Sequence, residues 1–210
     1  MALLLSMMSM MVTAQTLVVV DKNGKKTGYV VTSAVKGNLT AKYVGTGADK
    51  KKTSVTIKDT IKDVNGNTYK VTEIGAKALK GSKTVKKVKA GKNVISIGDE
   101  AFSGCVLLTE AALDTNLKTI GDKAFYKTAI KNLTLPANTT YLGAQFIAGD
   151  SKLKTLIIKS SGITVKTLGD NAFGGFGKSV VIKVPKKMKA KYTTLFLDEG
   201  LNNKVKIQIG

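Results

Sequence analysis

The 210-residue sequence contains no arginine, no histidine and no tryptophan. Arginine has the rigid fork that proteins use to read base edges and to hold phosphates bidentately, so its absence argues against specific nucleic-acid binding. The absence of histidine removes the commonest general base and every zinc or iron site that contains this residue. No catalytic constellation is found among the remaining residues. We therefore predict neither an enzyme, nor a cofactor, nor a metal site.

Cysteine is nearly absent as well, with Cys105 the single one. One thiol cannot form an internal disulfide or a cysteine-rich metal cage. A nucleophilic cysteine needs an activating base, and histidine does not occur. Cys105 follows Phe102 at a regular offset, which is typical of a small buried residue. We predict that it belongs to the core.

Negative charge is scarce: 14 acidic residues stand against 34 lysines, a formal net charge of +20. The lysines are spread along the chain and alternate with apolar residues, as in "TVKKVKAGK" (84–92). Lysine alone gives diffuse, salt-sensitive attraction to polyanions. The pattern favours a solvated, solubilising surface, or for one basic run the exposed face of a capping helix. That run is a possible polyanion contact and comprises Lys183, Lys186, Lys187, Lys189 and Lys191.

The first twenty residues carry no charge, and five of the six methionines fall within the first eleven. Val12-Thr13-Ala14 offers small residues at the positions that signal peptidase requires, with cleavage before Gln15. We predict a signal peptide over residues 1–14 and export of the protein. No basic residue precedes the apolar run, and an uncleaved membrane anchor or a buried segment is the alternative.

A repeat dominates the rest of the chain. Segments such as "VISIGDEAFSGC" (94–105), "LKTIGDKAFYK" (117–127) and "VKTLGDNAFGGF" (165–176) share a central glycine. Successive glycines are separated by 23, 23, 22 and 26 residues, a period typical of a solenoid in which each repeat forms one coil. The predicted repeat-turn residues are Gly75, Gly98, Gly121, Gly143 and Gly169.

Each repeat places an aliphatic residue before the glycine and an aromatic or leucine shortly after it. We expect the aliphatic residue to end a short strand, and the glycine to permit a sharp turn or a close approach of coils. An aspartate after the glycine is expected to cap a short helical turn that carries an inward Ala-Phe pair. In the fourth repeat Phe146 comes one residue early, which we take as the cause of the 22-residue interval. The predicted core residues are Ile74, Leu79, Ile97, Phe102, Ile120, Phe125, Leu142, Phe146, Leu168 and Phe173.

A second apolar-alternating run follows each corner, and its period of two predicts a strand. Stacked coil on coil, these strands would form a parallel sheet whose inner face includes Leu133, Leu156 and Ile182. No coil can bury its apolar side alone, so stability depends on stacking between neighbours. The five runs are 84–90, 107–113, 129–137, 152–160 and 179–185.

With these motifs, most clearly 94–105, 117–127 and "NLTLPANTTYLGAQF" (132–146), the chain resembles the BspA-type leucine-rich repeats of bacterial surface proteins. The resemblance extends from about Tyr69 to Pro185. It implies a secreted or cell-surface, non-enzymatic adhesion scaffold that binds an extracellular protein or glycan. The alternative is a structural wall component held by lysine attraction to anionic polymers.

The predicted fold class is a β-rich α/β solenoid of about five coils with a β-hairpin N-terminal cap and a helix–strand C-terminal cap. We divide the chain into a signal peptide (1–14), an N-terminal β cap (15–68), the solenoid (69–185) and a C-terminal cap (186–210). In the first cap, "NG" at 65–66 predicts a two-residue type I′ hairpin turn within 54–71. In the second, a helix over 186–198 is expected to stop at Gly200 and to precede a last strand at 204–210.

Overall fold

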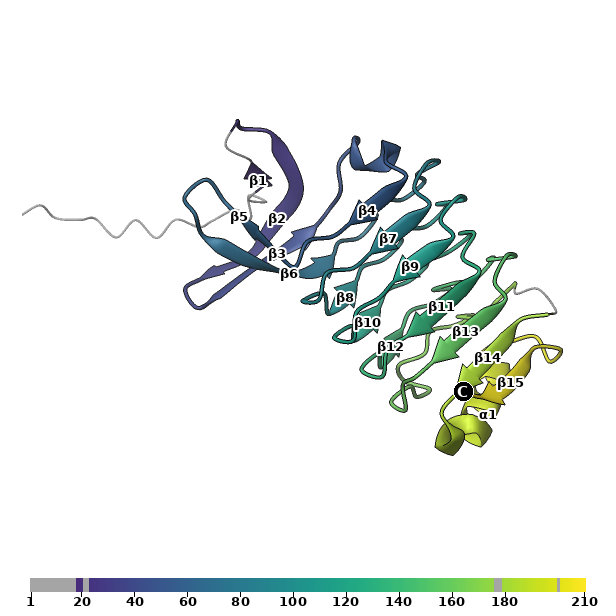
Figure 1. The fold of residues 1–210 in the computed structure, drawn as a ribbon. Helices are drawn as coiled ribbons and strands as arrows, with labels where there is room; N and C mark the ends of the chain where they lie inside the picture. The colour runs from purple at the N-terminus through teal and green to yellow at the C-terminus, as the bar shows by residue number, and fades with distance from the viewer. Residues whose placement is uncertain (1–17, 21–22, 176–178, 200) are drawn as a thin grey trace, which may run out of the picture.

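A computed structural model describes residues 18–20, 23–175, 179–199 and 201–210. The predicted signal peptide (1–14) and the predicted helix stop Gly200 lie outside these residues. The described chain forms a solenoid whose coils stack along one axis, with a β-sheet folded over its first coils and a short helix at its other end (Figure 1). The solenoid of about five coils predicted from the glycine period is confirmed. None of the described helices has the length and apolar character needed to cross a membrane.

One side of the solenoid carries strands that pair in parallel from coil to coil (Figure 1). Each of the five predicted runs contains one of them, and two more extend the stack at its ends. The ladder is divided in two between β9 and β11, which are neighbours without strand pairing. In order the strands are β4 (Ser54–Thr56), β7 (Lys87–Lys89), β9 (Glu110–Ala112), β11 (Asn132–Leu135), β13 (Thr155–Ile158), β14 (Val181–Val184) and β15 (Lys206–Ile209).

A second parallel ladder runs through the residues that precede the repeat glycines. Ile74, Ile97, Ile120 and Leu142 are in register with one another, and Leu168 continues the ladder as an isolated bridge. These side chains point into the core, because none of them is more than 4% exposed. The strands are β6 (Thr68–Ile74), β8 (Ser96–Ile97), β10 (Thr119–Ile120) and β12 (Tyr141–Leu142).

The N-terminal region is a β-sheet that joins this second ladder. β1 and β2 pair as an antiparallel hairpin, in agreement with the predicted β-hairpin cap. A third strand, which the sequence did not reveal, pairs in parallel with β6 and sets Tyr43 beside Ile74. Tyr43 therefore takes the position that an aliphatic residue holds in later coils. The elements are β1 (Val18–Val20), β2 (Lys26–Val35), β3 (Asn38–Tyr43), the 3-10 helix η1 (Asp49–Lys51) and β5 (Thr60–Lys62).

The predicted type I′ hairpin over 54–71 is wrong in two respects. Its first residues form β4, which belongs to the solenoid ladder, so the hairpin consists of β5 and β6 alone. Its loop is also longer, because the Asp63 N–H donates to the Asn67 carbonyl and the Gly66 N–H donates to the Asp63 carbonyl. Gly66 alone adopts positive φ there, and the Asp63 carboxylate accepts from the N–H groups of Asn65 and Asn67. Side-chain hydrogen bonds at Asp63 thus stabilise a wider turn than the "NG" pair alone would select.

The repeat glycines are required for close contact between coils, the second of the two roles expected of them. A tight turn does begin at these glycines, because the carbonyl of Gly98, for example, accepts from the Ala101 N–H, but it does not use a glycine-only conformation there. None of the five has positive φ. A Cβ on Gly98 would lie 2.6 Å from the backbone nitrogen of Ala76 in the preceding coil, which leaves no room for a side chain. The left-handed backbone occurs instead two and six residues after each glycine, as at Glu100 (φ 54°) and Gly104 (φ 70°). The corner is therefore a pair of tight turns.

The aspartates after the repeat glycines do not cap a helical turn, and this prediction is corrected. No helix forms at the corners of the described coils. The Asp99 carboxylate accepts a hydrogen bond from the N–H of Asp122 at 2.9 Å, and the Asp122 carboxylate accepts one from the N–H of Ala144 at 2.8 Å. Each carboxylate thus satisfies a backbone donor of the next coil. The side chain joins neighbouring coils, as the glycine contact does.

Asparagine side chains make a similar connection at another corner. The amide groups of Asn93, Asn116 and Asn138 donate to backbone carbonyls of the preceding coil, at 2.8–3.0 Å. These carbonyls belong to residues outside both ladders, where the asparagine amides supply hydrogen-bond donors. These bonds recur at the repeat period. Together with the glycine contacts, they hold neighbouring coils at a fixed distance from one another.

Phe146 does not occupy the phenylalanine position of its coil. The N–H of Phe102 donates to the Ala124 carbonyl, and the N–H of Phe125 donates in the same way to the Phe146 carbonyl. Phe146 therefore holds the alanine position, and Ile147, fully buried, holds the phenylalanine position. The missing residue of the fourth repeat falls at the loop near Ala129 instead. The corner tolerates no deletion because every second residue in it bonds to the next coil.

Aromatic rings fill the centre of the stack and continue into the C-terminal cap. Phe102 and Phe125 stack with ring centroids 5.1 Å apart, and Phe146 meets Phe173 edge-on at 5.8 Å. Phe173 in turn contacts Phe196 of the helix α1 (Lys189–Asp198) at 4.6 Å. The predicted C-terminal helix and strand are confirmed, with η2 (Lys186–Met188) preceding α1 and with β15 paired to β14. The helix closes the apolar end of the solenoid.

Candidate functional site

The broadest regular surface is the outward side of the strands β4 to β15, which we call the strand face. In parallel ladders, outward residues of neighbouring strands stand in register about 4.8 Å apart. Asn132 lies beside Thr155, and Thr134 beside Ile157, while the alternate residues of these strands are buried. The face is therefore a regular array, with short side chains at its centre and longer ones toward both ends. Its outward residues from β7 onward are Lys87, Lys89, Glu110, Ala112, Asn132, Thr134, Thr155, Ile157, Val181, Lys183, Lys206 and Gln208.

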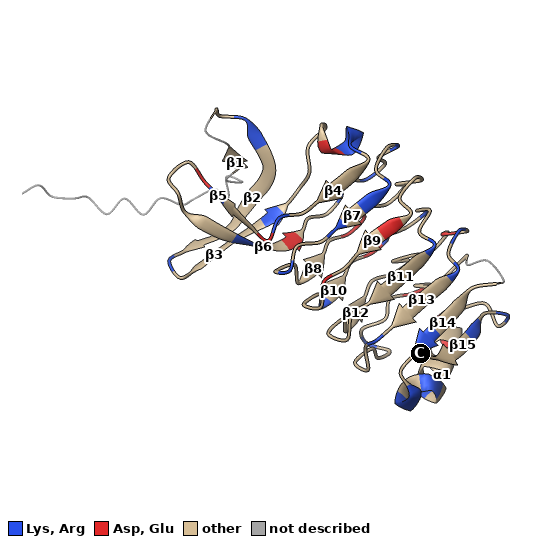
Figure 2. Cartoon of the chain, viewed as in Figure 1, with Lys and Arg blue, Asp and Glu red and all other residues tan. Residues whose placement is uncertain are grey.

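The electrostatics of the strand face are basic at both ends and neutral in the middle (Figure 2). Glu110 is the one carboxylate among these outward residues, and its Oε2 lies 2.9 Å from the Nζ of Lys87. Both partners are more than half exposed, so this ion pair contributes little to stability. Lysines on β7, β14 and β15 are left to attract anions. The array offers ammonium groups, hydroxyls and amides, which are suited to binding a polar ligand.

The five lysines predicted as a polyanion contact do not form one group. Lys183 is half-buried on the strand face, whereas the other four lie on η2 and α1 and are exposed (Figure 2). The N-terminus of α1 has no side-chain cap and no acidic residue in its first turn. Its partial positive charge therefore adds to the charge of the lysines. The cap lysines, as we name them, are Lys186, Lys187, Lys189 and Lys191.

The predicted repeat residues lie inside the stack. Every predicted core residue is buried, with Leu168 at 4% exposure and the others at 1% or less. The repeat glycines border the second ladder and contact the backbone of the preceding coil. None of these residues is placed to touch a ligand, and their role is to hold the strand face in register.

Cys105 is fully buried, and burial raises the pKa of its thiol. Its Sγ lies 3.0 Å from the Leu79 carbonyl, as a donor would. A thiol of this kind is inert because it forms little thiolate. Among the described residues, no group of three or more histidine, cysteine or acidic side chains could hold a metal ion.

A buried carboxylate, Asp150, was missed by sequence reasoning. It takes the position that Ser82, Cys105 and Thr128 hold in the preceding coils, and it is fully buried. It accepts a hydrogen bond from the Thr128 hydroxyl at 2.5 Å and others from the N–H groups of Ile130 and Lys152 at 3.2 Å. Burial raises its pKa to about 6, although these hydrogen bonds oppose the shift. The repeat alignment would have found it as an acid in a column of small neutral residues.

Asp150 should make stability depend on pH in an unusual direction. Its folded-state pKa of about 6 lies above the usual value, so the folded protein holds the proton more tightly than the unfolded chain. The stabilisation is full below about pH 4 and is lost as the pH rises through about 6. Relative to Asp150→Asn, the wild type should gain about 2–3 kcal/mol of unfolding free energy between pH 7 and pH 4.

Urea denaturation at several pH values would measure this difference. An exposed acid of α1, replaced as Asp198→Asn, is the control for a change of net charge. If the free energy of unfolding varied with pH in the same way for the wild type and Asp150→Asn, ionisation of Asp150 would not destabilise the folded state, and the prediction would be wrong.

Comparison with known proteins agrees with this geometry. The model of the BspA type leucine-rich repeat region matches residues 72–202 with six copies. The glycine alignment gave five copies over residues 69–185, one fewer than the family model finds. Curated protein sequences give no match.

Solved structures of bacterial leucine-rich-repeat proteins share the fold. A protein from Bacteroides capillosus is 27% identical, with 63% of this chain and 94% of that one covered and a TM-score of 0.51. The leucine-rich-repeat protein of T. pallidum is 21% identical, with 72% of this chain and 65% of that one covered and a TM-score of 0.57. The pneumococcal vaccine antigen PcpA is 20% identical, with 77% of this chain and 49% of that one covered and a TM-score of 0.58. At such identities the last two show the fold alone. The repeat geometry and the match over more than half of its length establish that this chain belongs to the BspA-type leucine-rich-repeat family.

Proposed function

We propose that the protein is a secreted or cell-surface, non-enzymatic binding scaffold that holds an extended partner along its strand face. The observation that carries this proposal is the regular array of outward side chains from β7 to β15, short at its centre and basic at both ends, with a single carboxylate that is already paired. A solenoid presents such residues in a fixed order, which suits recognition of a chain-like ligand. BspA-type repeat proteins are typically surface proteins, which supports the location.

The chemistry of the face favours an anionic partner. Lysines lie at both ends of the array and the protein carries a net charge of +20, so an acidic glycan or an acidic extracellular protein would be attracted over a distance. The neutral centre would provide hydrogen bonds from Asn132, Thr134 and Thr155. Attraction of this kind between exposed charges weakens as salt is added, because the ions screen it.

One substitution at the centre of the face tests the proposal. Thr134→Glu adds a negative charge to an exposed outward position of β11 and leaves the buried residues unchanged. The matched control is Thr115→Glu, an exposed site outside the strand face. Binding is measured against purified wall fragments, acidic glycans and extracellular-matrix proteins at about 50 and about 500 mM salt. Thr134→Glu should weaken binding about tenfold, and Thr115→Glu less than about twofold.

A second candidate function rests on the cap lysines and the uncapped start of α1. Together they form a concentrated positive charge away from the strand face, which favours attachment to an anionic wall polymer. Replacement of the four cap lysines by glutamine distinguishes the two functions. Loss of wall binding in this variant, with Thr134→Glu unaffected, would support the wall role and contradict binding by the strand face. Equal binding by all variants would contradict both.

A further inference from the structure

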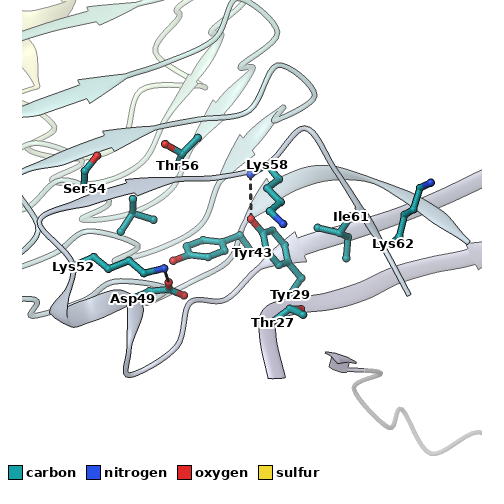
Figure 3. A pocket seen from close by; sticks show the side chains of 11 residues that line it. Thr27, Tyr29, Tyr43, Asp49, Lys52, Ser54, Thr56, Lys58, Ile61 and Lys62 are labelled. Atoms are coloured by element: carbon teal, nitrogen blue, oxygen red, sulfur yellow. Dashed lines mark hydrogen bonds and ion pairs between the residues drawn. The ribbon is translucent and has the colours of Figure 1, made fainter. Parts of the chain in front are cut away.

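A cavity of about 300 Å³ lies where the N-terminal sheet meets the first strand of the solenoid (Figure 3). It is separate from the centre of the strand face. Tyr29 of β2 and Tyr43 of β3 form one wall, Asp49 of η1 and Lys52 lie at one end, and Ile61 and Lys62 of β5 lie at the other. The volume equals that of about ten liquid waters, and it lies at the lower end of the range of small-molecule sites. It could hold one sugar or amino acid, but not a folded partner.

The Tyr43 hydroxyl is the clearest evidence that this cavity binds something. The residue is 2% exposed, and its hydroxyl is the buried side-chain polar atom in the described part of the chain that lacks a hydrogen-bond partner. An unpaired buried hydroxyl is costly, so a group from outside is expected to satisfy it. Burial, and then the nearby charge of Asp49, raise the pKa of Tyr43, so the hydroxyl stays protonated and can donate.

The neighbouring groups define what that outside group is. Asp49 is 8% exposed, and its carboxylate accepts from the Thr46 hydroxyl at 3.0 Å and from the Lys52 ammonium at 2.7 Å. Each of its oxygens has one further acceptor position. The Tyr43 hydroxyl lies near this carboxylate, and the charge of Asp49 together with a weak polar contact raises the pKa of Tyr43. The two groups do not, however, meet at hydrogen-bond distance. A ligand hydroxyl between them could accept from Tyr43 and donate to Asp49.

Positive charge stands on the opposite side of the cavity. Lys58 and Lys62 are exposed and form no ion pair with any described residue, whereas Lys52 is already paired with Asp49. The Tyr29 hydroxyl accepts from the Lys58 N–H at 3.1 Å (Figure 3) and can still donate its own proton. A ligand thus meets a donor–acceptor pair at one end, the Lys58 ammonium beside the tyrosine rings and the Lys62 ammonium toward the other end (Figure 3).

The edge of β4 adds backbone groups to the site. The Thr53 carbonyl and the Ile57 N–H bond to residues of the neighbouring coil next to and on β7. Backbone groups alternate in direction along a strand, so those of Ser54 and Thr56 point away from β7, toward the cavity edge. Both residues line the cavity, and β4 has no strand on that edge. These N–H and carbonyl groups are suited to ring hydroxyls.

We propose that this cavity binds an acidic sugar, a polyhydroxylated ring that carries a carboxylate. Ring hydroxyls bond to Tyr43, Asp49 and the edge of β4, and the carboxylate faces Lys58 and Lys62. Such a unit could be the end of an acidic glycan or a free sugar acid. The strand face is not needed for this binding, so the two proposals can fail independently.

The test uses the full chain, with glucuronate as the probe. Glucose, which has the ring hydroxyls without the carboxylate, and acetate, which has the carboxylate alone, are the comparison ligands. Titration calorimetry or ligand-observed NMR should show glucuronate binding, with glucose and acetate each at least about tenfold weaker. Tyr43→Phe should weaken glucuronate about tenfold and leave the thermal midpoint unchanged or higher, because it removes an unsatisfied buried hydroxyl. Lys58→Gln combined with Lys62→Gln should weaken glucuronate but not glucose.

Lys92→Gln is the matched charge control, since Lys92 pairs with Asp59 outside the cavity. It should leave glucuronate binding within about twofold. Acetate as strong as glucuronate would overturn the sugar assignment, and so would glucuronate binding that Tyr43→Phe leaves unchanged. Absence of glucuronate binding up to about 10 mM would overturn the site altogether. A lower thermal midpoint for Tyr43→Phe with no effect on the sugar would assign the hydroxyl to structural water.

Discussion

Phe125→Ala is expected to lower the free energy of unfolding by about 3–5 kcal/mol. The side chain is fully buried in a middle coil, and its ring stacks on Phe102 with an interplanar angle of 21°. Truncation removes that contact and leaves a cavity that the fixed backbone of the neighbouring coils cannot close. The backbone is fixed because Phe125 and its neighbours bond directly to the next coil, as in the Phe125 N–H donated to Phe146. Urea denaturation followed by circular dichroism would measure the loss.

Tyr141→Ala is the matched control for this substitution. It also removes an aromatic ring, but one that is 41% exposed on β12, and it should cost about 1 kcal/mol or less. A double-mutant cycle with Phe102→Ala separates the ring contact from the cavity, and a coupling of about 0.5–1.5 kcal/mol is expected. A cost below about 1 kcal/mol for Phe125→Ala would mean that the centre of the stack can repack.

The repeat could be predicted from the sequence because its parts recur at a fixed period. Glycine, the aliphatic residue before it and the apolar strand run are each visible in five copies, and these residues predict the coils and the parallel sheet of the strand face. The C-terminal cap was predicted separately, from the helical pattern of residues 186–198. The exact place of a deletion was not predictable. Phe146 can be aligned with Phe125 or with Ala124 at equal cost in sequence, and only the hydrogen bond to Phe125 shows that the second is right.

The backbone conformation at the corners could not be predicted from the sequence, for a different reason. The left-handed residues two positions after each glycine are Lys77, Glu100, Lys123, Gln145 and Asn171, which share no residue type that favours this conformation. Stacking imposes it: each of these N–H groups, except that of Asn171, donates to a carbonyl of the next coil. Aspartate was read as a helix cap for the same reason, because the coil that it bonds lies 22 or 23 residues away.

The cavity beside Tyr43 could not be predicted from the sequence either. Its lining comes from short segments between Thr27 and Lys62 that carry no motif, and β3, which positions Tyr43, was not predicted. Tyr43 holds a position that later coils give to isoleucine or leucine. A polar side chain in that column was the one sign of the site, and it becomes visible only once β3 is known to pair with β6.

Gly98→Ala should be almost as damaging as the loss of Phe125, although it adds a single methyl group. The new Cβ would lie 2.6 Å from the backbone nitrogen and 3.1 Å from the Cα of Ala76, and backbone atoms cannot move aside as a flexible side chain can. The ladder holds both coils on either side of the clash, since the Gly98 N–H donates to the Ile74 carbonyl at 2.7 Å. We expect a loss of about 3 kcal/mol, the upper part of the usual cost of overpacking.

Gly47→Ala separates this steric effect from the loss of glycine itself. A Cβ at Gly47 has no heavy atom within 4 Å, and its φ lies outside the left-handed region, so the substitution should be neutral or stabilise by up to about 1 kcal/mol. Both variants are compared by urea denaturation under the same conditions. If Gly98→Ala proved as harmless as Gly47→Ala, neighbouring coils could separate by several tenths of an ångström without cost. The repeat glycines would then not be the contact that sets the spacing of the coils. The side chains on the strand face would in that case be held less rigidly than a binding scaffold requires.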